Sequence, residues 1–255
     1  MVVAVFNEEA LLNEFIDKSL RDLARVSDDF EIVLVDDGSA DRSRSMEEAL
    51  AEKHPQIKLV KLEKNGGLGN AYAVGFKTAT KSIVFNNTVD SFFDSGELPK
   101  LLPYLEKADV LSCYRTNTKS NNPYQKLLTI GNYYLLRLLF PVKLKAYQTL
   151  QFYHRDFYQA TEVESRSTFI APEQLMKAIA MGKTVVEVPI VYHPRKKGEA
   201  KGGRIRFVLQ TLRDVFKFWF LWVVLRRPLV IVGEEKFTIK PYYSETLKRA
   251  KESSS

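Results

Sequence analysis

Cysteine and long apolar runs are scarce in this 255-residue chain. Its one cysteine, Cys113, excludes a disulfide framework and a zinc site built from several cysteines, and is typical of a reducing compartment. The longest apolar run, 218–225, is far shorter than the roughly 20 residues that cross a bilayer. Residues 1–9 show no signal-peptide pattern. We therefore expect a cytoplasmic protein, or one on the cytosolic face of a membrane.

Glycine and proline are also few, with 12 and 10 residues, which excludes a low-complexity or collagen-like chain. The content of 45% hydrophobic and 27% charged residues is ordinary for a globular protein. A chain of this length can form one large α/β domain or two small ones. It contains no internal repeat and no clear linker between domains.

Positive charge is in excess, with 38 basic against 31 acidic residues and a net charge of +7. The excess is clustered in the last quarter of the chain, which indicates an anionic partner such as nucleic acid, phospholipid or a phosphorylated small molecule. Nucleic acid is the least favoured of these, because no recognition module accompanies the basic residues. The clustered residues are Arg195, Lys196, Lys197, Lys201, Arg204, Arg206, Arg213, Lys217, Arg226 and Arg227.

Short β-rich runs alternate with helical patterns in the first half of the chain, which predicts an α/β fold with a doubly wound, mostly parallel sheet. The predicted strands are 2–6, 30–35, 57–62, 82–85 and 110–114, with helices at 8–26, 41–53, 65–78 and 96–106. The second half predicts helices at 123–139 and 172–181 and strands at 151–154 and 184–191. We divide the chain into a domain at 1–203, an amphipathic helical region at 204–232 and a polar, loosely held tail at 233–255.

Polar residues follow the predicted strands, and ligands of doubly wound sheets bind beyond the carboxyl ends of the strands. Asp37 has a carboxylate suited to a base edge or a ribose hydroxyl, although a turn made by Asp-Gly-Ser explains it equally well. Asp90 is a candidate for a divalent cation that bridges a diphosphate, and Asp94 is better explained as a helix cap.

Three basic residues, Arg115, Arg195 and Lys201, are candidates for binding phosphate, although each alone is more often a solvated surface charge. The glycine-rich run 65–69 suits either a phosphate at a helix N-terminus or, more simply, a tight strand-to-helix turn.

The predicted helix 205–225 carries an apolar stripe, three consecutive aromatic residues at 218–220 and flanking basic residues. This composition favours a helix that lies in a membrane interface, held by its aromatic residues and by attraction to anionic lipids. The alternative is that the stripe simply packs on the sheet.

Taken in order, these segments resemble family 2 glycosyltransferases of the GT-A fold, and in particular the dolichol and polyprenyl-phosphate sugar synthases. The resemblance covers about residues 2–215, and the ordered set of motifs is far more specific than any one of them. The segments that carry it are Ala4-Val-Phe-Asn-Glu8, Val33-Leu-Val-Asp-Asp-Gly-Ser39, Asn65-Gly-Gly-Leu-Gly-Asn-Ala71, Cys113-Tyr-Arg-Thr116, Val186-Glu-Val-Pro189 and Arg195-Lys-Lys-Gly-Glu-Ala-Lys201.

The resemblance implies transfer of a sugar from a UDP- or GDP-sugar to a polyprenyl or dolichyl phosphate, with inversion at the anomeric carbon. It implies that Arg115, Arg195 and Lys201 contact the donor diphosphate and the acceptor phosphate, and that Asp90 is the metal and diphosphate site, with Mg²⁺ or Mn²⁺ as the cation. The donor-binding set that it implies is Ala4, Phe6, Glu8, Val35, Asp37, Thr88, Val89 and Asp90.

Departures from the family pattern weaken the expected metal site. Thr88 stands where the first acid of Asp-x-Asp is expected, and Phe92 stands where a glutamine ligand often follows. Further along, Lys145-Ala-Tyr-Gln148 replaces an acidic stretch. Altered cation dependence or loss of catalysis would follow, so a non-catalytic domain that binds nucleotide-sugar, lipid or a partner is one alternative. Another is an enzyme with a saccharide or small-molecule acceptor. Attachment to the membrane surface would use helix 205–225 or a membrane-anchoring subunit.

Overall fold

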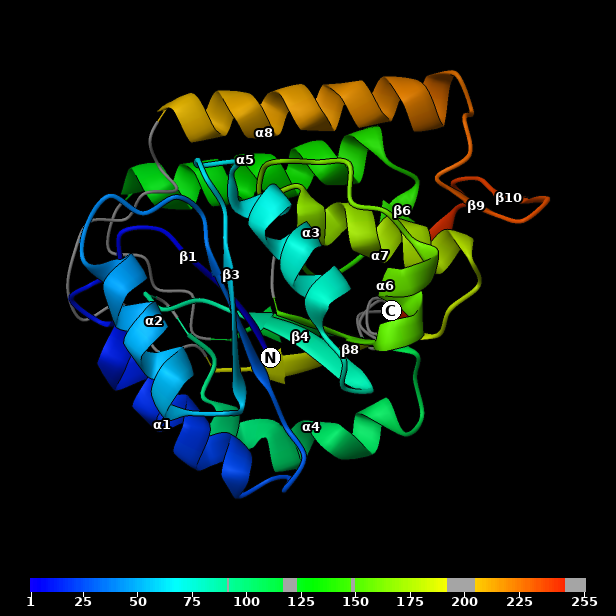
Figure 1. Ribbon diagram of the computed structural model, residues 1–255. Helices are drawn as coiled ribbons and strands as arrows, with labels where there is room; N and C mark the ends of the chain where they lie inside the picture. The colour runs from blue at the N-terminus through cyan, green and yellow to red at the C-terminus, as the bar shows by residue number, and fades with distance from the viewer. Residues whose placement is uncertain (91, 117–122, 148–149, 192–204, 246–255) are drawn as a thin grey trace.

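The computed structural model describes residues 1–90, 92–116, 123–147, 150–191 and 205–245. Within them a seven-stranded sheet has the order β3-β2-β1-β4-β7-β5-β8 (Figure 1). All neighbouring pairs are parallel except the two made by β7, which runs antiparallel to β4 and β5. The expected mostly parallel, doubly wound sheet is thus confirmed. The strands are β1 (Val2–Val5), β2 (Ile32–Asp36), β3 (Ile57–Lys61), β4 (Ile83–Asn87), β5 (Val110–Arg115), β7 (Gln151–His154) and β8 (Val185–Ile190).

Helices cover both faces of the sheet. One face packs against α1 (Leu12–Ala24), α2 (Ser43–Lys53) and α4 (Leu98–Leu105), with a short 3₁₀ turn at Ser95–Glu97 before α4. The other face packs against α3 (Leu68–Thr78), α6 (Arg155–Ala160) and α7 (Ile170–Ala180). Beyond this second layer lie α5 (Pro123–Leu139) and α8 (Ile205–Phe218), and α8 continues as π-helical turns over Trp219–Val224 (Figure 1).

Successive residues of the strands point to opposite faces of the sheet, and each face carries its own hydrophobic cluster. Val2, Val33 and Val35 belong to the cluster under α3, whereas Val3 and Leu34 belong to the cluster under α1. Because both faces of the central strands are covered, their sequences are almost continuously apolar. This explains why the sequence alone locates these strands to within about two residues.

The segment after α8 is more firmly attached than the sequence suggests. A hairpin of β9 (Val230–Val232) and β10 (Glu235–Phe237) is followed by β11 (Tyr242–Tyr243), which pairs in parallel with β6 (Val142–Lys143). Ser244 is buried and its N–H donates to the carbonyl of Lys143 at 3.0 Å. The expectation of a loosely held tail is therefore wrong for residues 235–237 and 242–244, because backbone hydrogen bonds hold them. The boundaries at 203 and 232 stay a prediction.

We expect Gly75→Ala to destabilise the protein by about 1–3 kcal/mol, the usual cost of overpacking a core. A Cβ at Gly75 would lie 2.3 Å from Cγ1 of Val2, a buried β-branched side chain that cannot easily turn away. The measurement is the free energy of unfolding in urea. The matched control is Gly131→Ala on α5, where nothing lies within 4 Å of an added Cβ, and where stability should rise by up to about 1 kcal/mol. Equal stability of both variants would contradict the close packing of α3 on β1.

Candidate functional site

Three neighbouring parallel strands end at the same edge of the sheet and carry the predicted donor-binding residues there. Val5 of β1 is in register with Asp36 of β2, and Val3 of β1 is in register with Asn87 of β4. Residues 6–8, Asp37 and residues 88–90 therefore leave the sheet at one edge. Strands lie about 4.8 Å apart, so the β2 and β4 ends are separated by roughly 10 Å, with the β1 end between them. The fold thus brings together the segments that sequence reasoning assigned to one site.

The loop after β1 is fixed against the loop after β2 by side-chain hydrogen bonds. Asn7 adopts a positive φ of 55°, and its Oδ1 accepts the N–H of Ala40 at 2.8 Å. The N–H of Glu8 donates to Oγ of Ser43 at 2.8 Å. Phe6 and Glu8 are half-buried beside this contact. The expected positions of Phe6 and Glu8 at the edge are therefore set by the loop rather than by the strand itself.

Asp37 is buried, and its two carboxylate oxygens hold the glycine-rich turn that opens α3. They accept the N–H groups of Gly66 at 2.7 Å and Gly67 at 3.1 Å. Burial raises the pKa of Asp37, although these two hydrogen bonds oppose the rise. Gly67 has φ of 89°, and a Cβ there would lie 2.6 Å from the carbonyl oxygen of Arg166. The run 65–69 is therefore a tight turn clamped by Asp37, and lone pairs of the carboxylate remain for a ligand.

The loop after β4 is closed by a residue that sequence reasoning did not single out. Asn87 is buried, its Oδ1 accepts the N–H groups of Thr88 and Phe93 at 3.0 Å, and its Nδ2 donates to the carbonyl of Phe93 at 2.9 Å. Val89 packs in the core. Thr88 and Asp90, on either side of it, are half-buried at the edge. A donor would therefore meet Val89 through its backbone.

Two apolar residues of the expected donor-binding set lie inside the strands. Ala4 and Val35 are direct partners in the β1–β2 register, and both pack with the cluster under α3. Val35 is fully buried, so its side chain forms the floor below the edge rather than a surface that a ligand can touch.

Asp90 is the carboxylate expected to hold a divalent cation. No group of three His, Cys, Asp or Glu side chains in the described part of the chain could hold a metal ion. Mg²⁺ is often bound through one or two carboxylates plus substrate phosphates and water. Asp90 therefore fits a cation only where the phosphates of a ligand complete the coordination.

Arg115 is the last residue of β5 and is exposed. Because β7 is antiparallel to both β4 and β5, these two strands are parallel to each other, and Arg115 lies at the same edge as Asp90. Arg195 and Lys201, the other two predicted cations, lie outside the described residues.

The loop 165–167 connects this edge to α8. Its Arg166 carbonyl accepts the N–H of Gly69 at 3.2 Å. Asp214 of α8 accepts the N–H groups of Arg166 and Ser167, both at 3.2 Å, and the hydroxyl of Ser167 at 2.7 Å. The turn that contacts Asp37 and the surface helix α8 are thereby held by the same loop.

Part of the apolar stripe on α8 is covered by the protein itself. Val215, Phe218 and Trp222 are buried, and Phe218 and Trp222 lie against Phe169. The expectation that the aromatic run 218–220 as a whole faces a membrane is therefore wrong for Phe218, and Trp222 beyond the run is buried as well. The large apolar side chains that remain exposed on this helix are Ile205, Phe207, Leu209, Phe216, Phe220, Val224 and Leu225. In the described residues, no helix combines the length and the apolar character needed to cross a membrane.

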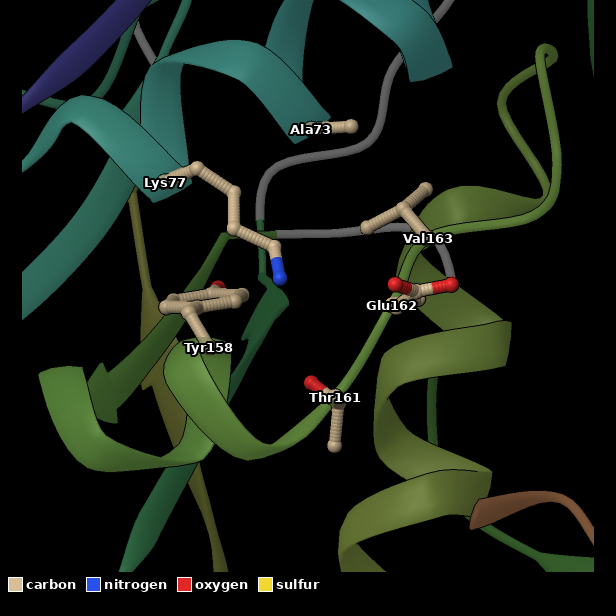
Figure 2. Close-up of a pocket in the computed structure, with 6 residues that line it drawn as sticks. All are labelled: Ala73, Lys77, Tyr158, Thr161, Glu162 and Val163. Atoms are coloured by element: carbon tan, nitrogen blue, oxygen red, sulfur yellow. The ribbon is translucent and has the colours of Figure 1, made fainter. Parts of the chain in front are cut away.

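A pocket of about 170 Å³ lies against the C-terminal half of α3 (Figure 2). No residue of the predicted donor or phosphate site lines it. Figure 2 shows Lys77 of α3 above the ring of Tyr158, with Glu162 on the facing loop. We do not assign the donor to this pocket, because α3 begins at the carboxyl edge of the sheet and this half of the helix points away from it.

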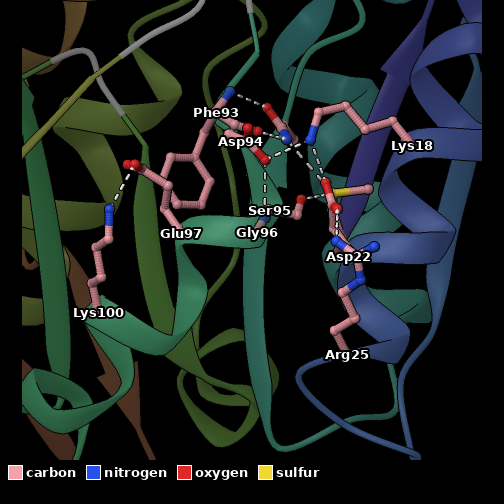
Figure 3. Close-up of polar contacts among 11 residues, drawn as sticks. Lys18, Asp22, Arg25, Phe93, Asp94, Ser95, Gly96, Glu97 and Lys100 are labelled. Atoms are coloured by element: carbon pink, nitrogen blue, oxygen red, sulfur yellow. Dashed lines mark hydrogen bonds and ion pairs between the residues drawn. The ribbon is translucent and has the colours of Figure 1, made fainter.

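Asp94 has the structural role expected for it. Its Oδ1 accepts a hydrogen bond from the N–H of Gly96 at 3.0 Å and forms an ion pair with the ammonium group of Lys18 at 2.7 Å. Lys18 also forms an ion pair with Asp22 of α1 (Figure 3). Burial alone would raise the pKa of Asp94, but the hydrogen bonds from Lys18 and Gly96 outweigh it and lower the pKa. Asp94 therefore joins the start of α4 to α1.

Comparison with known proteins identifies a family and similar relatives. The family described as Glycosyl transferase family 2 matches residues 1–161. An undecaprenyl-phosphate 4-deoxy-4-formamido-L-arabinose transferase from Pectobacterium carotovorum is 27% identical over 212 residues, which cover 82% of this chain. The chain spans 63% of the length of that relative. A dodecaprenyl-phosphate galacturonate synthase from Rhizobium johnstonii is 23% identical, with 89% of this chain and 68% of the relative covered.

Solved structures share the fold. Glucosyl-3-phosphoglycerate synthase from Mycobacterium tuberculosis, in complex with Mn²⁺, uridine diphosphate and phosphoglyceric acid, aligns with a TM-score of 0.62 at 18% identity, over 84% of this chain and 76% of its own. A mannosyltransferase from Pyrobaculum calidifontis, in complex with GDP-mannose and Mn²⁺, aligns with a TM-score of 0.58 at 18% identity, over 85% of this chain and 63% of its own. These similarities confirm the expected GT-A fold.

We expect Glu47→Gln to stabilise the protein at alkaline pH. Glu47 of α2 is fully buried and neither carboxyl oxygen has a hydrogen-bond partner among the described residues. Burial and the nearby Asp36 raise its pKa from 4.5 to about 9. Between these values the folded protein holds a proton that the unfolded chain releases, so wild-type stability falls as pH rises, by at most about 1.4 kcal/mol per pH unit.

The measurement is the urea unfolding midpoint of both proteins between pH 5 and pH 9. The gain from Glu47→Gln should grow with pH and amount to more than about 1 kcal/mol at pH 8. Glu48→Gln, which removes the neighbouring half-exposed carboxylate paired with Lys61, is the control and should show no such growth. A gain that does not depend on pH would contradict a protonated Glu47.

Proposed function

The chain belongs to glycosyl transferase family 2, and we propose that it moves a sugar from a UDP- or GDP-sugar to a polyprenyl or dolichyl phosphate at the cytosolic face of a membrane. The observation that carries this proposal is the convergence of Phe6, Asp37 and Asp90 on neighbouring strand ends of one sheet edge. The names of the two bacterial relatives, which are polyprenyl-phosphate sugar transferases, support the acceptor class. The structures with bound uridine diphosphate and GDP-mannose support the donor class.

In this proposal the residues at the sheet edge contact different parts of the donor. Phe6, Glu8 and Asp37 surround the base and ribose of the donor, and Thr88 and Asp90 lie at its diphosphate. An oxygen of the acceptor phosphate attacks the anomeric carbon, the bond from that carbon to the diphosphate oxygen breaks, and the configuration inverts. The attacking phosphate is already ionised, so no strong general base is needed.

Negative charge develops on the leaving diphosphate in this reaction, and preorganised cations stabilise that charge best. Arg115, Arg195 and Lys201 are the basic residues we assign to the diphosphate and the acceptor phosphate. A divalent cation between Asp90 and the diphosphate would neutralise further charge. Because no group of three His, Cys, Asp or Glu side chains in the described part of the chain could hold a metal ion, we expect that cation to bind weakly until the donor is present.

Membrane contact is assigned to the exposed side of α8. It carries Phe216 and Phe220, with Arg213 and Lys217 among them, all exposed. Amphipathic helices of this composition lie in the interface of anionic membranes. A membrane-anchoring subunit is the other route to the same location.

A second candidate function keeps the donor and changes the acceptor to a saccharide or small molecule. The structural neighbour that holds phosphoglyceric acid favours it. Mass spectrometry separates the two, because only a polyprenyl phosphate acceptor gives a lipid-extractable phosphodiester. A third candidate, a non-catalytic domain, is favoured by Thr88 in place of an acid.

The proposal is tested by transfer of radiolabel from UDP- and GDP-sugars to a short polyprenyl phosphate, in the presence of anionic vesicles and Mg²⁺ or Mn²⁺. We expect transfer by the wild-type protein and a loss of about 10²–10³-fold in kcat for Asp90→Ala, the usual effect of removing one charge-stabilising group. No transfer with any donor or cation would overturn the proposal in favour of the non-catalytic domain. Thr88→Asp, which adds the second acid, should lower the Mn²⁺ concentration needed for half-maximal rate.

Vesicle binding tests the role of α8. We expect Arg213→Gln to weaken cosedimentation with vesicles that contain phosphatidylserine by about fivefold, since one basic residue near an anionic surface contributes about 1 kcal/mol. Lys107→Gln removes an exposed charge after α4, on the other face of the sheet, and should leave binding unchanged. Equal effects of the two variants would contradict an interface on α8.

A further inference from the structure

Lys145 is a basic residue without a role in the proposed reaction, and the fold holds it near the carboxyl edge of the sheet. It lies between β6 and β7 and is exposed. Its ammonium nitrogen is 4.1 Å from the centre of the Tyr114 ring, and Tyr114 directly precedes Arg115 at the end of β5. A cation over an aromatic face is attracted by the ring without being neutralised. The positive charge of Lys145 is thus attracted by this ring and by the Glu187 carboxyl, and it remains exposed to an anion.

The backbone of Lys145 is anchored as well. Its N–H donates to Oε1 of Glu187 at 2.7 Å, and Glu187 is a buried residue of β8. Burial raises the pKa of Glu187. Two residues earlier, Lys143 of β6 pairs with Tyr243 of β11, and its carbonyl accepts the N–H of Ser244. Lys145 therefore stands on a segment that is fixed from two sides, unlike most surface lysines.

The contact with Tyr114 places Lys145 on the β5 side of the proposed site. Val84 of β4 and Val110 of β5 belong to the cluster under α3, so the alternation of strand residues directs Tyr114 of β5 to that same face. In the order β4-β7-β5 the two strands are two steps apart, roughly 10 Å. Tyr114, whose ring Lys145 contacts, is therefore roughly 10 Å across the sheet from the end of β4, where the donor diphosphate is assigned.

We propose that Lys145 binds the phosphate of the acceptor, an inference that rests on the proposed function. A phosphate monoester carries close to two negative charges at pH 7. Lys145 and the neighbouring Arg115 supply two positive charges on this side of the edge. Lysine binds phosphate as a point charge, which suits an acceptor whose phosphate oxygen must remain free to attack.

The experiment measures kinetics with geranyl phosphate, a short isoprenyl monophosphate, as the acceptor. Lys145→Ala should raise the KM for geranyl phosphate about tenfold, the effect of losing one charge-assisted hydrogen bond, with the KM for the sugar donor unchanged. Lys145→Arg should restore most of the affinity because it keeps the charge. Tyr114→Leu should raise the same KM and Tyr114→Phe should not, since only the leucine removes the aromatic face. Lys100→Ala, on α4 across the sheet, is the control and should match the wild-type protein.

Titration calorimetry with geranyl phosphate, and with geraniol as the phosphate-free control, keeps the test independent of catalysis. Equal affinity of the wild-type and Lys145→Ala proteins for geranyl phosphate, or no binding by either, would overturn the inference. So would a KM change confined to the sugar donor, which would assign Lys145 to the diphosphate. Binding of geranyl phosphate through Lys145 without any sugar transfer would instead overturn the proposed function and leave the phosphate site standing.

Discussion

The hydrogen bonds from Gly66 and Gly67 to the Asp37 carboxylate are the contact on which the arrangement of this site depends. They join the end of β2 to the start of α3 at the point where the chain reverses. Since a Cβ at Gly67 would lie 2.6 Å from the Arg166 carbonyl oxygen, the loop 165–167 can pack on this turn only when residue 67 is glycine. That loop in turn binds Asp214 of α8. The strand edge and the surface helix are therefore connected through one chain of hydrogen bonds.

The loop 162–167 needs an anchor because it has no regular secondary structure to satisfy its backbone. Buried Glu173 of α7 provides one, since it accepts the N–H groups of Glu164 and Ser165, both at 2.9 Å. Its charge is balanced by buried Lys177 at 2.7 Å, which also donates to the carbonyl of Glu162. Removing Lys177 would leave the buried Glu173 carboxylate without this cation. The buried pair Glu173–Lys177 of α7 thus holds the loop 162–167 in place through hydrogen bonds to its backbone.

The sequence predicted the strands, the flanking helices and the edge that brings Asp37 near Asp90, because hydrophobic period and chain order determine these features. It did not predict that Asn87 closes the loop after β4, since one asparagine beside three other polar residues carries no periodic signal. Nor could it decide which stripe of α8 is covered. Phe218 and Phe220 are equally apolar, and only the packing of Phe169 against Phe218 separates the buried ring from the exposed one. Partners distant in the chain settle these positions, and the local pattern does not contain them.

The distribution of charge along the edge has a consequence for how a sugar could pass between two phosphates. Acidic side chains occupy the β2 and β4 ends, where Asp37 is already committed to backbone N–H groups, and basic ones occupy the β5 side. Because the described residues offer no group of three His, Cys, Asp or Glu side chains that could hold a metal ion, a cation at the β4 end would be held largely by the donor itself. It would then arrive and leave with the nucleotide. The lasting positive charge would then belong to the protein, at Arg115 and Lys145. An acceptor phosphate would find its counter-charges in place before the donor binds, whereas the donor half of the edge would be completed only by its own ligand.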